Sequence, residues 1–117
     1  MDDQSQDAPV EIRELFLQIM QERHVTCTIN WKSLCTENVL RDLGCSPKHV
    51  NEILYEHVLN GGAMSWKPNP DPDYENENFG AVVLKQEFFA DYYIKFTIEE
   101  PDRDPYINVV SAHFSGQ

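Results

Sequence analysis

Apolar residues recur at helical spacing in the first half of the chain, beginning just after Pro9. Proline suits the first turn of a helix because its missing N–H is not needed there. The apolar positions that follow are three or four residues apart, so they fall on one face of a helix. They are Ile12, Leu15, Phe16, Ile19 and Met20. The pattern predicts an amphipathic helix with one face in the core.

Two more helices are expected between residues 33 and 60. The first runs over about 33–43 and ends at Gly44, which suits a left-handed cap. Ser46 and Pro47 then form a cap and first-turn pair for the next helix, which Asn60 and the two following glycines end. The two helices should form a hairpin with a tight connection.

A period of two, which is typical of strands, dominates the second half of the chain. Residues 79–85, 92–98 and 106–114 are predicted to be three successive strands, and the β-branched segment 25–31 a short extended one. The segment 67–78 holds three prolines and four acids, so it is expected to be an acidic, proline-rich loop. The acidic residues 1–8 are expected to be disordered.

Helices followed by a meander of strands indicate an α+β fold. The length of 117 residues suits one domain, residues 1–117, with a single core. We expect the N-terminal helices to pack on one face of an antiparallel sheet of three to four strands. The other face of that sheet would then be free for function.

Polar side chains are predicted to converge on that free face. In the strand 92–98, Tyr93 and Lys95 point away from the apolar residues between them. Strict alternation in the last strand puts His113 on one face with Ser111 and Val109. If the polar sides of the two strands coincide, Tyr93, Lys95, Ser111 and His113 share one surface.

These four side chains supply the groups that metal-free cleavage of an RNA phosphodiester needs. His113 would act as base or acid, Lys95 would stabilise the charged transition state, and Tyr93 would be an orienting hydrogen-bond donor. A lysine and a histidine on a half-polar strand are also common on solvated sheet faces without any chemistry. No nucleotide-binding, α/β-hydrolase or zinc-protease motif occurs, and no cofactor is expected.

The net charge of −11 opposes nonspecific binding to nucleic acid or to anionic lipid. Any RNA chemistry must therefore depend on a local patch. No apolar stretch reaches the length of a signal peptide or of a membrane helix, so a cytoplasmic protein without a membrane partner is expected.

Cysteine and aromatic residues leave further alternatives open. Cys27, Cys35 and Cys45, with His24 and His49 nearby, lack the paired knuckle of a zinc site, and buried free thiols are the better interpretation. His57 lies on an apolar stripe and is expected to be a hydrogen-bonded residue at the edge of the core. Three aromatic residues could anchor a protein interface or pack against the helices: Trp31, Trp66 and Tyr74.

Three stretches, in this order of elements, resemble the MqsR family of bacterial type II toxins, small ribonucleases with a fold related to the RelE group. They are residues 39–54 (VLRDLGCSPKHVNEIL), 92–98 (YYIKFTI) and 109–113 (VVSAH). The resemblance extends from about Val10 to Phe114. It implies metal-independent, sequence-biased cleavage of mRNA and control by a cognate antitoxin.

Carried over residue by residue, the resemblance implies that Tyr93, Lys95 and His113 are active-site residues. Ser111 matches the serine of the family's final strand. Lys85 and Gln86, in the preceding strand, are similar in placement to polar residues of the family's central strand, and would contact the substrate with Ser111.

A second hypothesis interprets the negative charge as the functional feature. An acidic protein-binding module, such as an immunity protein, an antitoxin or a phage-encoded inhibitor, would use it to meet a basic partner or to mimic nucleic acid. The sequence leaves open whether the protein is a monomer or a homodimer.

Overall fold

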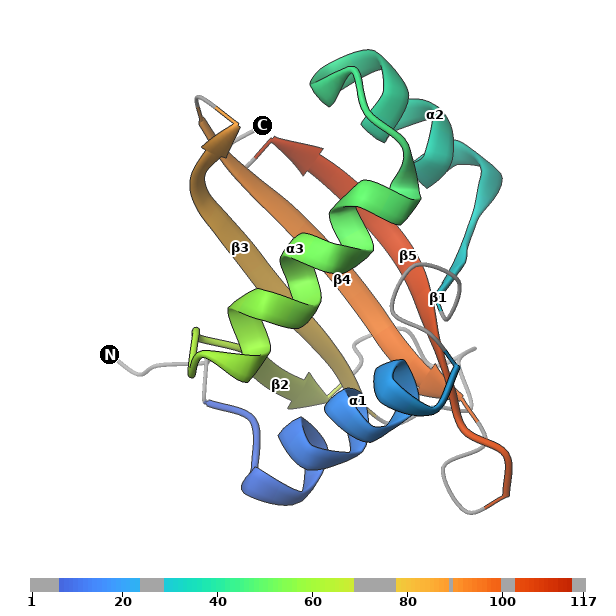
Figure 1. Cartoon of the computed structure of the whole chain (residues 1–117), viewed down its shortest axis with the longest axis vertical. Helices are drawn as coiled ribbons and strands as arrows, with labels where there is room; N and C mark the ends of the chain where they lie inside the picture. The colour runs from blue at the N-terminus through green and yellow to red at the C-terminus, as the bar shows by residue number, and fades with distance from the viewer. Residues whose placement is uncertain (1–6, 24–28, 69–77, 89, 100–102, 115–117) are drawn as a thin grey trace.

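The computed structural model describes residues 7–23, 29–68, 78–88, 90–99 and 103–114. Along the chain, three helices precede four of the five described strands (Figure 1). The elements, in chain order, are α1 (Val10–Arg23), β1 (Ile29–Trp31), α2 (Ser33–Leu43), α3 (Pro47–Leu59), β2 (Ser65–Pro68), β3 (Asn78–Phe88), β4 (Ala90–Glu99) and β5 (Tyr106–Phe114). The α+β class is confirmed.

The three predicted helices form close to the expected positions. Gly44 ends α2 in the left-handed conformation, with φ of +69°, and its N–H donates to the Leu40 carbonyl. Ser46 is extended and Pro47 begins α3, as the pair of residues indicated. Local signals are sufficient here because a helix closes its hydrogen bonds within one turn.

The sheet has five strands in the order β1-β5-β4-β3-β2, and it is mixed. The prediction of an antiparallel sheet of three to four strands was wrong in two respects. β1 pairs in parallel with β5, and β2 pairs antiparallel with β3. β2 also contains the first two residues of the segment 67–78, which was expected to be a loop. Trp66 of the same strand packs against the core. Residues 69–77 of that loop lie outside the described ranges.

Two residues of the N-terminal segment are attached to the sheet, although 1–8 was expected to be disordered. Asp7 forms an isolated antiparallel bridge with Ser65. Ala8 is buried, and its N–H donates to the Met64 carbonyl at 2.7 Å. The chain therefore reaches the first helix through a contact with β2, and residues 1–6 are outside the described part.

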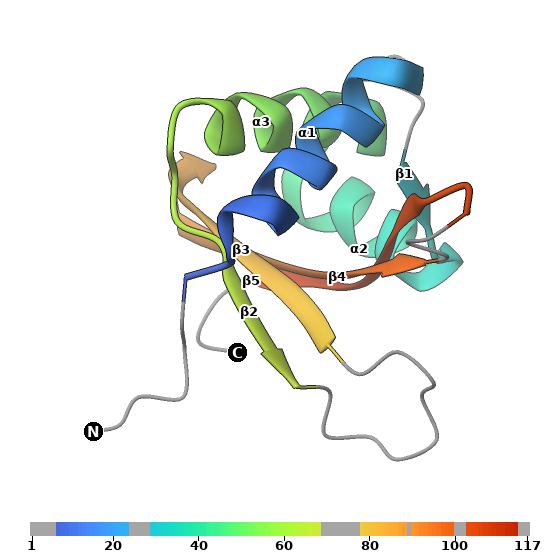
Figure 2. The ribbon, with the colours of Figure 1, turned by 90° about the horizontal axis from the view of Figure 1, so that it is seen from below.

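The core lies between the helices and one face of the sheet. Figure 2 shows the three helices gathered above that face. Phe96 of β4 lies at the centre, with its ring centroid 5.2 Å from that of Phe16 in α1 and 6.5 Å from that of Trp66. Gly80 on β3 provides space for the Phe96 ring, because a Cβ at this position would come within 2.4 Å of it.

Arg13 of α1 binds the C-terminal end of α3. Its Nη2 donates to the carbonyl of Val58 at 3.2 Å and to that of Gly62 at 2.7 Å. These carbonyls belong to the last turn of α3 and to the residues after it, where partners within the helix are missing. A half-buried guanidinium thereby fixes α1 relative to α3.

A β-bulge in β5 changes which residues of that strand face the helices. Phe96 pairs with Val109 and the adjacent Lys95 pairs with Ser111, so Val110 is an extra residue. Val109 is buried before the bulge, and Ala112 is buried after it. The prediction that His113 shares a face with Val109 is therefore wrong, because the bulge shifts the alternation by one residue.

Candidate functional site

The sheet face opposite the helices, termed the open face below, carries the predicted catalytic residues. Tyr93 of β4 pairs with His113 of β5, and Lys95 pairs with Ser111. Their neighbours along β4, Ile94 and Phe96, are buried under the helices, so these four side chains point away from the helices. All four are half-buried. The predicted convergence of Tyr93, Lys95, Ser111 and His113 on one face is confirmed, whereas their role stays a prediction.

His113 and Tyr93 form a stacked ring pair. Their centroids are 5.0 Å apart and their planes differ by 29°. The Nδ1 atom of His113 lies 2.8 Å from the carbonyl oxygen of Phe114. A carbonyl oxygen can only accept, so Nδ1 carries a proton and donates it in this bond. In the neutral ring Nε2 is then the nitrogen with a lone pair, which is the atom that a general base uses.

Tyr93 is held as a neutral phenol. Burial raises the pKa of its hydroxyl above the ordinary value, because desolvation disfavours the phenolate. At neutral pH the side chain therefore keeps its proton and can donate a hydrogen bond to an anionic group.

Lys95 lies over an aromatic ring that the sequence did not indicate as part of the site. Its Nζ is 4.2 Å from the centroid of Phe79 on β3. The Nζ of Lys67 lies 6.0 Å from the same centroid, and Lys67 pairs with Phe79 across β2 and β3. Two cations from non-adjacent strands thus meet at one ring on the open face.

Lys67 is the residue that sequence reasoning missed, because it was assigned to the proline-rich loop. The signal available was the pair Trp66 and Lys67, an apolar residue followed by a polar one, as in a strand with one buried face. Two residues are too few to establish a period, so only pairing with β3 makes this segment a strand.

Of the three predicted substrate-binding side chains, the structure describes only that of Ser111. Ser111 faces outward opposite Lys95. Lys85 and Gln86 fall within β3, but their side chains lie outside the described part of the structure.

The charges of the open face are mixed. The ammonium groups of Lys67 and Lys95 lie there, and β4 also carries Asp91 and Glu99 on the same side by alternation. The helices, by contrast, carry more carboxylates than cations. The two ammonium groups come together at Phe79, between the edge strand β2 and β4, and the acidic residues of β4 lie on either side of Lys95 along that strand.

Some of the cysteine and histidine residues singled out in the sequence lie within the described part of the structure. Cys35 is buried and Cys45 half-buried, both with free thiols whose pKa burial raises, whereas Cys27 and His24 lie outside the described residues. Within the described ranges no three His, Cys, Asp or Glu side chains come together as metal ligands would. His57 is hydrogen-bonded as expected, with Nε2 2.8 Å from the Ala63 carbonyl oxygen.

Both tryptophans pack against the core cluster, which was one of the two alternatives. The indole N–H of Trp31 donates to Oδ1 of the buried Asn51 at 2.8 Å. Tyr74 lies outside the described residues.

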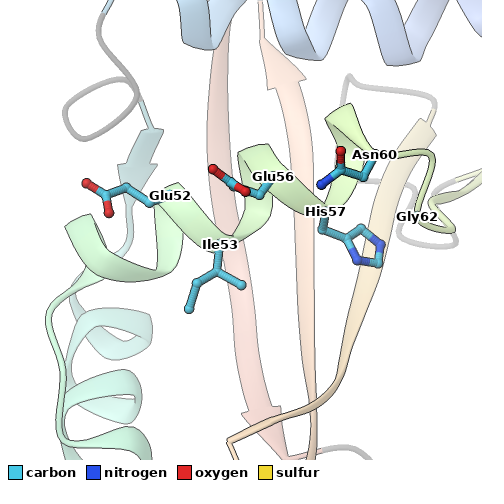
Figure 3. Close-up of a pocket in the computed structure, with 6 residues that line it drawn as sticks. All are labelled: Glu52, Ile53, Glu56, His57, Asn60 and Gly62. Carbon is cyan, nitrogen blue, oxygen red and sulfur yellow. The ribbon is translucent and has the colours of Figure 1, made fainter.

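A hollow of about 500 Å³ lies on the helix layer, along α3. Figure 3 shows Glu52 and Glu56 extending from the same side of the helix, while His57 turns toward Gly62 at the C-terminal end. The hollow is open and is lined by two exposed carboxylates. Its described lining includes no lysine or arginine that could stabilise an anionic transition state, whereas Lys67 and Lys95 lie on the open face.

Among the described residues, no helix is both long and apolar enough to span a membrane. Comparison of the chain with protein-family models, with curated proteins and with solved structures found no match.

Proposed function

We propose that the protein is a metal-independent endoribonuclease of the toxin type, with its active site on the open face. The observation that supports this best is the pairing of His113 with Tyr93 on the same face as Lys95 and Lys67. A base, a neutral donor and two cations are the groups with which a protein cleaves RNA without a metal. The relationship to the MqsR family belongs to the same proposal.

In the proposed reaction, Nε2 of His113 takes the proton of a ribose 2′-hydroxyl. The hydrogen bond from Nδ1 to the Phe114 carbonyl fixes the tautomer that this step needs. The 2′-oxygen then forms a bond to the adjacent phosphorus while the bond from phosphorus to the 5′-oxygen breaks, so the products are a 2′,3′-cyclic phosphate and a 5′-hydroxyl end. The leaving 5′-oxygen takes a proton from solvent water. During this step negative charge grows on the phosphate oxygens. Lys95 and Lys67 stabilise that charge, and the protonated Tyr93 orients a phosphate oxygen.

Single-stranded RNA is the proposed substrate. The open face combines aromatic rings with cations, as sheet surfaces that bind unpaired nucleotides do. The helices lie on the opposite side of the sheet from the open face (Figure 2). At cellular ionic strength, charges farther away than about 8 Å are largely screened. The carboxylates of the helices are therefore compatible with local binding of RNA on the open face.

Expression in cells tests the proposal as a whole. We expect growth arrest together with degradation of mRNA, and relief of both by a cognate antitoxin acting in the cytoplasm. Unchanged growth and intact transcripts, while folded protein accumulates, would contradict the proposed function.

The sharpest test at the residue level compares the substitution of two different histidines. His113→Ala should lower the rate of RNA cleavage by about 10²-fold or more, because it removes the base. The matched control is His49→Ala, which removes an exposed imidazole from α3. The control should cleave like the parent protein, and both variants should melt within a few degrees of it. Cleavage should persist in EDTA. Equal rates for the two variants would exclude His113 as the base.

A second proposal follows from the acidic hollow on α3. In this proposal the exposed carboxylates of Glu52 and Glu56 bind a basic protein, as the hypothesis of an acidic binding module requires. Capture of such a partner that weakens as salt rises, in protein that cleaves no RNA, would favour this function over the nuclease. Binding that is indifferent to salt would count against it.

A further inference from the structure

The ring of Phe79 is the point where the side chains of Lys67 and Lys95, both described on the open face, come together. Lys95 reaches it from β4 and Lys67 from β2, and both ammonium nitrogens lie within 6.0 Å of its centroid. Phe79 itself is only 7% exposed, although it is on the side of the sheet without helices. Its residual surface is too small to offer a stacking platform to a base.

Two ammonium groups that extend from β2 and β4 toward the strand between them would normally point apart, because like charges repel. The face of an aromatic ring carries negative electrostatic potential, and it attracts a cation from either side. A shared ring therefore offsets part of the repulsion and keeps two flexible side chains in one region. The position of Phe79 on β3, between the two strands that carry the lysines, makes this sharing possible.

We propose that Phe79 is a positioning residue that holds Lys67 and Lys95 together as the binding site for one phosphodiester of the RNA backbone. This inference rests on the proposed nuclease function. Phe79 does not touch the RNA, and it acts through the two ammonium groups. Preorganised cations bind a phosphate better than mobile ones because less side-chain entropy is lost on binding.

Two carboxylates of β4 lie on the same face as this pair. Asp91 and Glu99 are four residues to either side of Lys95, which corresponds to about 13 Å of extended backbone. The hydroxyl of Thr97 donates a hydrogen bond to the Glu99 carboxylate at 2.6 Å, so this carboxylate lies back along the strand toward Lys95. Its negative charge repels a phosphate, and two cations rather than one are therefore needed to bind a phosphate here.

The test compares Phe79→Leu, which keeps an apolar side chain, with Phe79→Tyr, which keeps the ring. The probe is a fluorescent single-stranded RNA oligonucleotide with 2′-O-methyl groups, which cannot be cleaved by attack of the 2′-oxygen. Phe79→Leu should weaken its affinity about threefold to tenfold, whereas Phe79→Tyr should stay within about twofold. The slope of log affinity against log salt should fall by up to about 0.7 in Phe79→Leu, as for the loss of one phosphate contact.

A background without the two lysines separates positioning from direct contact. In the Lys67→Ala/Lys95→Ala protein, adding Phe79→Leu should cause no further loss of affinity. A further loss would show that Phe79 contacts the RNA itself, and would overturn the inference.

NMR tests the placement of the lysines without RNA. Protons held over an aromatic ring shift upfield, so the side-chain methylene signals of Lys95 should be upfield in the parent protein and should return to ordinary positions in Phe79→Leu. Ordinary positions in the parent protein would overturn the inference even if Phe79→Leu failed to fold.

The binding measurements also distinguish the two levels of the proposal. If the parent protein neither binds nor cleaves RNA, the proposed function fails and the inference with it. If the parent protein does both and Phe79→Leu matches it, only the positioning role of Phe79 is refuted.

Discussion

The fold shifts the pKa of Tyr92 strongly upward. It is fully buried, its hydroxyl donates to Oδ2 of Asp42 at 3.1 Å, and its ring meets Phe114 edge to face at 5.1 Å. Burial raises the pKa of this phenol far above its ordinary value of 10, and the hydrogen bond to the Asp42 carboxylate raises it further. The folded protein therefore holds the Tyr92 proton more tightly than the unfolded chain does.

This difference predicts how stability depends on pH in alkaline solution. A raised pKa stabilises the fold fully below pH 10, and the contribution is lost as the pH rises above 10, by at most about 1.4 kcal/mol per pH unit. Tyr92→Phe should cost about 1–3 kcal/mol at pH 8, because Asp42 loses a donor. The difference in unfolding free energy between the two proteins should then shrink between pH 10 and 11. Urea unfolding measures it, and a difference that stays constant with pH would contradict the assignment.

The catalytic candidates illustrate what one residue's sequence context can and cannot indicate. Tyr93 and Lys95 lie between three large apolar residues, and this alternation was enough to predict that both face away from the core. Lys67 has no such context, because its strand is short and runs directly into prolines. Its place beside Phe79 depends on pairing with a strand that begins at residue 78.

At the scale of elements, the bulge in β5 determines whether the site exists. If Val110 paired with β4 instead of forming a bulge, continuous alternation from the buried Ile107 and Val109 would carry Ser111 and His113 to the helix side. The structure inserts Val110 between the pairs Phe96–Val109 and Lys95–Ser111. Ala112, a small residue, then fills the core position, and its carbonyl accepts a hydrogen bond from Asn38 of α2 at 3.0 Å.

Two single-residue deletions test this account. Deleting Val110 should leave a regular ladder with Ser111 still opposite Lys95, so the fold and RNA cleavage should be retained. Deleting Ala112 should bring His113 to the position opposite Ile94, inside the core. Burial of an imidazole without a partner there should cost about 2 kcal/mol or more and abolish cleavage. Thermal unfolding and cleavage assays compare the two, and equal damage from both deletions would show that the bulge has another role.

The helices were the elements that the sequence predicted best, and the edge strands those it predicted worst. Caps and apolar spacing act within a few residues, so Gly44 and the Ser46–Pro47 pair were sufficient for α2 and α3. β1 has only three described residues and pairs with a strand almost eighty positions later. A partner so distant in sequence leaves no local signal.

At the scale of the whole molecule, the described helices carry more carboxylates than cations, whereas the open face carries charges of both signs. The helix layer carries exposed carboxylates such as Glu52 and Glu56, while the lysines that meet at Phe79 lie on the open face. The long-range field therefore slows the approach of RNA, and the local contacts hold it after it has arrived.

Neutralising the distant carboxylates should separate these two effects. At low salt, Glu52→Gln/Glu56→Gln should raise the association rate of single-stranded RNA by about twofold and leave its dissociation rate unchanged. The difference should vanish near 1 M salt, where the Debye length is about 3 Å. Stopped-flow fluorescence measures both rates, with Glu52→Asp/Glu56→Asp as the control that keeps the charge. Acceleration that persists at 1 M salt would show that the effect is not electrostatic.

The sequence by itself determined the α+β class, the three helices, the negative charge and the outward direction of Tyr93 and Lys95. Each follows from composition or from a pattern that repeats over neighbouring residues. Only the tertiary structure decided the parallel pairing of β1, the meeting of Lys67 with Lys95 at Phe79, and the bulge at Val110 that turns His113 outward. These features depend on which distant segments pair and in which register, and packing against the core selects that register.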